Sequence, residues 1–230
     1  MKLLRSLLVL SLWLPFASEN NTAVGTLNNG KVNYVSLPAT DSIVLAFVVS
    51  SNIQSNIIAP DDFTFIIGDT VPGAKTALYI KNAINATSDY IFEFSENTDS
   101  LVLFSTYPNH YTINPADIKV DIQVEPSRSL ISRNVFVEYE NSIVLMFSGL
   151  AQNVRTYDTP EGQIEVIDQG TANIGIRLGE SLIETVGEVF DLSAPFEESA
   201  ANVTITVVLT PQQTEAPPGG TIPPVSEINQ

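Results

Sequence analysis

The chain has 230 residues, a length that suits one large or two small domains. It carries 26 acidic against 10 basic residues, a formal net charge of −16, which disfavours a nucleic-acid backbone as its partner. It contains no cysteine, which excludes disulfide bonds, zinc–thiolate sites and cysteine nucleophiles.

The N-terminus has the pattern of an export signal. Lys2 and Arg5 precede an apolar run over residues 7–16, which is too short to span a bilayer comfortably and is typical of a signal peptide. We expect residues 1–25 to hold the signal peptide and the start of an N-terminal arm, and the mature chain to be secreted without a membrane span. Cleavage fits after Ala17 or Ser18, or after the small-residue stretch Ala23–Gly25.

The first half of the chain predicts a series of short strands. The expected strands cover residues 31–37, 42–50, 63–67, 74–84, 90–95, 100–106 and 117–125. Residues 74–84 also fit a helical face, but their copy later in the chain alternates like a strand. The strands 90–95 and 100–106 are expected to form a hairpin. The last strand places Ile118, Val120, Ile122 and Val124 on one face, as in a half-buried strand of an antiparallel sheet.

The second half repeats this order. Residues 127–133 are expected to be a linker, followed by strands at 134–139, 142–148, 163–167, 172–178, 189–192 and 202–210, with a short helix within 181–189. Residues 212–230 are rich in proline and predict an extended tail without a core of its own.

An internal duplication explains this order. Residues 42–47 and 142–147 are identical at five of six positions, and four further blocks match in the same order. The last of these matches 116–126 with 201–211, which leaves the strand 100–106 without a counterpart. The predicted fold is all-β: two tandem antiparallel β-sandwich units of jelly-roll or immunoglobulin-like type, at 26–126 and 134–211. The sequence leaves open whether they form separate sandwiches or share one sheet system.

No catalytic constellation stands out. His110 is the single histidine, and no G-x-S-x-G pattern or phosphate-binding glycine loop accompanies it. A pair of carboxylates for glycoside hydrolysis stays open, because their separation depends on the fold. We therefore expect a protein that is not an enzyme.

Two acidic loops are candidate calcium sites. Asp61 and Asp62 in the first unit correspond to Asp158 and Glu161 in the second, and hard oxygen ligands suit Ca²⁺. The alternative is that these are solvated acids on a loop. Three N-x-S/T sequons, at Asn20, Asn85 and Asn202, are candidate glycosylation sites if the chain is exported.

In its signal peptide, β-rich body, acidity and absence of cysteine, the chain resembles subunits of archaeal threads and cannula-like tubules, and pilin-type proteins assembled by donor-strand exchange. The resemblance implies a homopolymer outside the cell, helped by calcium. The apolar strand over 100–105 is the expected contact, through Leu101, Leu103 and Phe104.

Two alternatives remain at this point. One is a carbohydrate- or surface-binding module that would present loop tyrosines, namely Tyr107, Tyr111 and Tyr157, to a glycan. The other is a viral coat or spike component, which shares sandwich folds and self-assembly.

Overall fold

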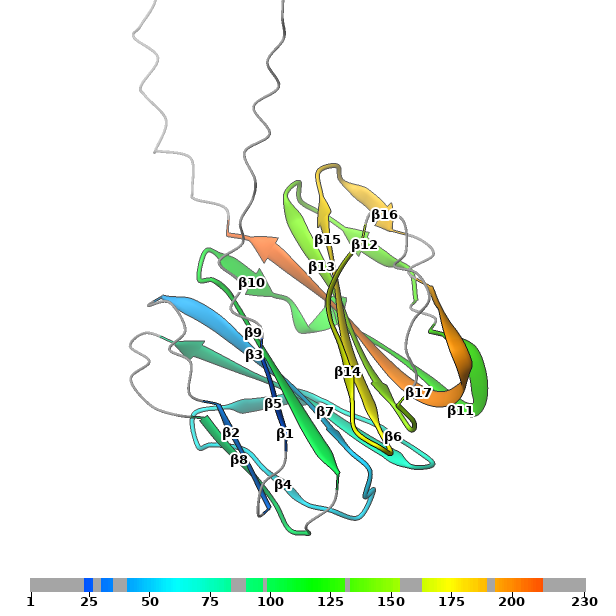
Figure 1. Ribbon diagram of the computed structural model, residues 1–230. Helices are drawn as coiled ribbons and strands as arrows, with labels where there is room; N and C mark the ends of the chain where they lie inside the picture. Colours follow the sequence, from blue (N-terminus) through cyan, green and yellow to red (C-terminus); the bar gives the residue numbers. More distant parts are fainter. Residues whose placement is uncertain are drawn as a thin grey trace, which may run out of the picture.

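The computed structural model describes residues 23–26, 30–34, 41–83, 90–96, 99–130, 133–153, 163–189 and 193–212. These residues form seventeen strands and one 3₁₀ turn at Pro115–Asp117, which confirms the all-β prediction (Figure 1). In the described part of the chain, no helix is long and apolar enough to cross a membrane. Residues 1–22 of the predicted signal peptide and arm lie outside the described residues, whereas residues 23–25 belong to the paired strand β1 (Ala23–Thr26).

The first repeat consists of two sheets. The first inner sheet has the order β1–β9–β3–β7–β5, with β6 beside β7. Its strands are β1 (Ala23–Thr26), β9 (Ser100–Pro108), β3 (Ser42–Ser50), β7 (Ala74–Ala83), β5 (Thr64–Ile67) and β6 (Thr70–Val71). The first outer sheet has the order β2–β8–β4, formed by β2 (Lys31–Tyr34), β8 (Tyr90–Phe94) and β4 (Ile57–Ile58). All of these pairings are antiparallel.

The second repeat has the same plan. The second inner sheet has the order β10–β17–β13–β15–β14, and β11 also pairs with β17. Its strands are β10 (Tyr111–Ile113), β17 (Ala194–Pro211), β13 (Ser142–Leu150), β15 (Gly175–Ile183), β14 (Ile164–Gly170) and β11 (Lys119–Leu130). The second outer sheet consists of β12 (Val135–Val137) and β16 (Gly187–Val189).

The four sheets form four layers, because the two inner sheets pack face to face between the two outer sheets (Figure 1). Apolar side chains from both inner sheets meet in the central core. Each inner sheet also encloses an outer core with its own outer sheet. The two repeats are therefore not separate sandwiches. They share their largest core.

The near-identical strands β3 and β13 lie in the middle of this arrangement. In β3, Leu45 and Phe47 point into the central core, while Val44 and Ala46 point into the first outer core. Because successive side chains of a strand alternate between faces, a strand buried on both sides must be apolar throughout. This is why the repeated sequence lacks the polar alternation of a surface strand.

The register defines which strands are equivalent. Ile43 of β3 pairs with Tyr107 of β9, and Ile143 of β13 pairs with Leu209 of β17. Strand β9 is therefore the counterpart of β17. Strand β11 is the counterpart of β1, because β1 pairs with the side of β9 that faces away from β3, and β11 pairs with the side of β17 that faces away from β13. The predicted match of 116–126 with 201–211 is wrong, and β9 is not an insertion. The sequence match was misleading because alternating Val, Ile and Thr residues align equally well with any strand that has this alternation.

Three further predictions are wrong. Strands β8 and β9 do not form a hairpin, because β8 belongs to an outer sheet and β9 to an inner one. The predicted linker 127–133 overlaps β11, which continues to Leu130 and pairs there with Ala194. The expected helix within 181–189 consists of the end of β15 and the whole of β16. The strand predicted at 42–50 is confirmed at both ends.

Pro72 and Gly73 form the turn that joins β6 to β7. Gly73 has a φ of 88°, as the third residue of a type II turn requires. A second backbone feature is duplicated: Asp41 (φ 61°) and Asn141 (φ 60°) adopt the left-handed conformation immediately before β3 and β13. Asp and Asn tolerate this conformation better than other side chains, so both repeats start their central strand with the same sharp bend.

The inner sheets make their closest approach at Gly149. A Cβ atom at this position would lie 2.5 Å from Thr76 Cγ2 and 3.0 Å from Val49 Cγ2. Beside it, the rings of Phe47 and Phe147 contact each other with centroids 5.4 Å apart. The residue of the first repeat that is equivalent to Gly149 is Val49. Because Gly149 has no side chain, it leaves room for the side chain of Val49.

We expect Phe147→Ala to lower the free energy of unfolding by about 3–5 kcal/mol, because the ring is completely buried in the central core. We also expect calorimetry to show one transition for the wild type and for the variant, since both repeats depend on that core.

The exposed Ile164 provides a control, and Ile164→Ala should change stability by less than about 0.5 kcal/mol. Two separate transitions, of which only one moves in the Phe147 variant, would contradict the shared core.

Candidate functional site

The residues predicted as assembly contacts belong to the core. Leu101, Leu103 and Phe104 are 1%, 0% and 0% exposed, because β9 lies between β1 and β3 and is covered on both faces. The prediction that they form exposed contacts is wrong. Their apolar sequence belongs to a strand that is buried on both faces, as β3 is.

Asn202 is also buried. Its side chain is 0% exposed and donates hydrogen bonds to Gln123 Oε1 (2.8 Å) and to the carbonyl oxygen of Ala200 (3.4 Å). The sequon lies inside β17 and not at an exposed strand start, so the prediction of a glycan at this position is wrong for the folded chain. Asn20 and Asn85 lie outside the described residues.

The predicted calcium ligands are only partly described. Asp61 and Asp62 are exposed, and the carboxylate of Asp62 forms an ion pair with Lys81 Nζ. Lys81 lies 4.5 Å from the centroid of the Tyr90 ring, so it caps the edge of the first outer core by a cation–π contact. Asp158 and Glu161 lie outside the described residues. Among the described residues, no three His, Asp or Glu side chains lie close enough together to hold a metal ion.

Tyr107 and Tyr111, the two predicted platform residues that the structure describes, do not form a binding platform. Tyr107 is completely buried, and its hydroxyl donates a hydrogen bond across the central core to Glu180 Oε2 at 3.3 Å. Burial raises the pKa of the Tyr107 phenol well above its ordinary value, and the negative charge of Glu180 raises it further. Tyr111 is nearly buried, and its hydroxyl donates to the carbonyl oxygen of Asn141. Tyr157 lies outside the described residues.

A polar row distinguishes the second outer core from the first. Thr204, Ser148 and Arg177 lie side by side across β17, β13 and β15 and are all buried. Arg177 is 0% exposed, and its Nη2 donates to Gln163 Oε1 at 3.1 Å, while Nε lies 3.8 Å from Glu165 Oε2. Burial lowers the pKa of the guanidinium, and the nearby carboxylates partly offset this.

The equivalent row in the first repeat is entirely apolar. Val102, Val48 and Ala77 occupy the same register positions across β9, β3 and β7. In the described part of the chain, the hydroxyls of Ser148 and Thr204 and the Nε and Nη1 atoms of Arg177 have no hydrogen-bond partner. At this row, one repeat therefore has only apolar side chains in its outer core, and the other has a buried arginine.

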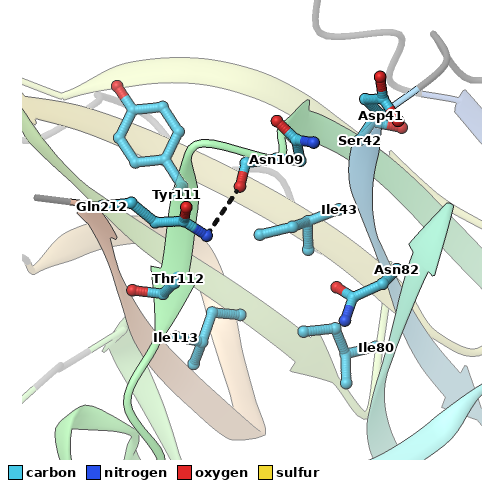
Figure 2. A pocket seen from close by; sticks show the side chains of 10 residues that line it. All are labelled: Asp41, Ser42, Ile43, Ile80, Asn82, Asn109, Tyr111, Thr112, Ile113 and Gln212. Carbon is cyan, nitrogen blue, oxygen red and sulfur yellow. Dashed lines mark hydrogen bonds between the residues drawn. The ribbon is translucent and has the colours of Figure 1, made fainter. Parts of the chain in front are cut away.

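An open pocket lies at one end of the central core, where the inner sheets separate. It has a volume of about 410 Å³. Figure 2 shows its lining, which comes from four parts of the chain: the start of β3, the end of β7, the segment from Asn109 to β10, and the residue after β17. The lining residues are Asp41, Ser42, Ile43, Ile80, Asn82, Asn109, Tyr111, Thr112, Ile113 and Gln212.

The wall of this pocket consists of apolar side chains and amide side chains. Ile43 belongs to the central core, and Ile80 and Ile113 pack against it. Asn82 and Gln212 surround them, and Gln212 Nε2 donates to the carbonyl oxygen of Asn109 at 3.1 Å (Figure 2). The ring of Tyr111 points away from the three isoleucines in this view, so it offers no face to a sugar.

The exposed edge of β11 is a second candidate surface. Ile118 and Val120 pack against the central core, as the alternation predicted. Ile122 and Val124 follow in the same phase but are 43% and 51% exposed. The apolar face of β11 therefore continues beyond the part that the chain itself covers.

The charges on this edge are partly neutralised. Asp121 accepts hydrogen bonds from Arg133, at 2.7 Å from the backbone nitrogen and 2.9 Å from Nε. Lys119 lies two residues earlier, and Glu125 is exposed four residues later. The edge strands β5 and β14 each carry a register irregularity, which is a common protection against edge pairing, and β11 carries two, after Gln123 and after Ser127, so its regular part covers Lys119–Gln123.

Comparison with protein-family models, with curated proteins and with solved structures finds no significant match.

We expect Tyr107→Phe to make the protein more resistant to alkaline pH. The folded-state pKa of Tyr107 lies above the unfolded value of about 10, so its neutral phenol stabilises the fold fully below about pH 10, and this contribution is lost as the pH rises further. Urea unfolding at about pH 8 and about pH 11 measures the difference between wild type and variant.

Tyr139→Phe is the matched control, because that ring is 36% exposed and it should behave like the wild type. An equal alkaline loss of stability in the wild type and in Tyr107→Phe would contradict the role of the buried phenol.

Proposed function

We propose that this chain is a secreted structural subunit that pairs with a second copy of itself through the edge of β11, as a step in building an extracellular filament, tubule or surface layer. The observation that carries the proposal is the exposed apolar face of this edge, at Ile122 and Val124. A long edge strand with an apolar face is a template for a further strand.

The sequence of this edge is self-complementary. If two copies of residues 119–125 pair antiparallel with Ile122 opposite Ile122, then Val120 lies opposite Val124, and Lys119 lies opposite Glu125. Because the arrangement has twofold symmetry, the Val120–Val124 and Lys119–Glu125 contacts each form twice, and the Ile122 pair on the axis forms once. Residues directly opposite each other share a face, so the four valines and two isoleucines form one apolar stripe.

The pairing also extends a structure that already exists. Strand β11 is an edge of the second inner sheet, so a second β11 joins two six-stranded sheets into one. The apolar stripe is continuous with the central core through Ile118 and Val120. The added backbone hydrogen bonds supply affinity, as in other cases of strand addition.

The net charge of −16 on each copy opposes this association. The pairing edge itself is less affected, because Arg133 neutralises Asp121 and Lys119 faces Glu125 in the proposed register. We further propose that divalent calcium favours assembly by reducing the repulsion between the acidic copies.

A charge-swap series tests the register. Lys119→Glu and Glu125→Lys each place like charges opposite each other twice, so each variant should weaken the dimer by roughly tenfold. The double variant restores opposite charges and should return the dissociation constant to near that of the wild type. Sedimentation equilibrium of the mature chain, with calcium and with chelator, measures these constants.

A second pair of variants tests the apolar stripe. Ile122→Asp should leave the chain folded and monomeric, because the side chain is exposed in the single copy. Ile164→Asp is the matched control, since Ile164 is a 72% exposed apolar residue on the edge strand β14, and it should associate normally. A wild-type chain that stays monomeric at all concentrations would overturn the proposal.

A further inference from the structure

We infer that the open pocket at the end of the central core receives the ring of Phe136 from another copy of the chain. This inference rests on the proposed function and adds to it. The β11 pairing is twofold and ends at a dimer, so growth beyond the dimer needs a second, head-to-tail contact.

The internal duplication indicates what kind of side chain fits the pocket. Tyr107 and Leu209 occupy equivalent positions, as do Glu180 and Ile80. On the β9 side of β3, the Tyr107 ring extends to Glu180 on the other inner sheet. On the β7 side of β3, the shorter Leu209 stands in place of the tyrosine, and the pocket lies beside Ile80. The pocket is thus the counterpart of a place that holds an aromatic ring.

The wall of the pocket suits an apolar side chain carried on a peptide backbone. Ile43, Ile80 and Ile113 provide apolar contact, while the amides of Asn82 and Gln212 offer hydrogen bonds to main-chain groups. Asp41 is the one charged residue of the ten that line it. In a chain with 26 acidic residues, this is a surface that another copy can approach with little repulsion.

Phe136 is the side chain that matches this pocket. It lies on β12, between the buried Val135 and Val137, and is itself 58% exposed. Among the described residues, Phe65 is a second strongly exposed aromatic, but it already packs edge-on against Tyr79 with centroids 5.6 Å apart.

Charged side chains stand beside the ring. The hollow next to Phe136 is lined by Lys119, Asp117 and Glu188, and Lys119 already faces Glu125 in the β11 pairing, so the contact with the pocket depends on the ring. Asp117 and Glu188 would repel Asp41, so their side of the hollow faces away from Asp41 in the proposed contact. The ring and the pocket are different surfaces of one chain, so the contact is head-to-tail and leaves both ends free to continue.

Photo-crosslinking tests the contact directly. Phe136 is replaced by p-benzoylphenylalanine in the full mature chain, and crosslinked peptides are identified by mass spectrometry after assembly. We expect crosslinks between position 136 of one copy and the segments that contain Ile80 and Ile113 of another. Crosslinks that map elsewhere in an assembled sample would overturn the inference while leaving the proposed β11 pairing intact.

Two substitutions measure the consequence for assembly size by light scattering. Phe136→Ala removes the ring, and Ile80→Phe fills the pocket from within at a position that is already half-buried. Each should stop assembly at the dimer. Phe65→Ala is the matched control and should assemble like the wild type.

A mixture of the two variants separates this inference from a general loss of stability. Ile80→Phe keeps its ring and Phe136→Ala keeps its pocket, so their dimers should combine into larger species when mixed. Failure of the mixture to grow, or growth of either variant alone, would overturn the inference. If the wild type never associates, the proposed function fails and the inference fails with it.

Discussion

The structure depends on the burial of β3 and β13 on both faces. Each strand contributes alternate side chains to two cores, so the central core and the outer cores are linked through the same few residues. A sheet that is apolar on one face needs one covering layer, whereas a sheet apolar on both faces needs two. The four-layer arrangement follows from this requirement, since each inner sheet provides one of the two layers that the other needs.

Much of the local structure could be predicted from the sequence. The repeated apolar strand depends on neighbouring residues, and the structure confirms it at both ends. The alternation in Asp117–Glu125 is confirmed for Ile118 and Val120, which pack against the central core, whereas Ile122 and Val124 are exposed. Strand pairing could not be predicted in this way. The match of 116–126 with 201–211 kept the apolar residues in phase but chose the wrong partner, because register between distant strands is set by packing that the sequence does not display.

The two candidate surfaces could also be predicted only in part from the sequence. The sequence indicated the apolar face of β11, but not that the first inner sheet ends before it covers Ile122 and Val124. The pocket could not be found at all, because Ile43, Ile80 and Ile113 come together only when the two inner sheets pack. Asn202 shows the opposite error: a local motif signalled exposure, and the pairing of β17 with its neighbours buried it.

The small differences between the repeats also bear on how the chain reaches this fold. Two strands identical at five of six starting positions could exchange places during folding and produce a misassembled molecule. In the wrong sheet, β3 would bring Val49 to the position of Gly149, where even a Cβ atom would lie 2.5 Å from Thr76 Cγ2. The resulting steric clash disfavours the exchange. Gly149 therefore helps to direct each copy of the strand to its own sheet.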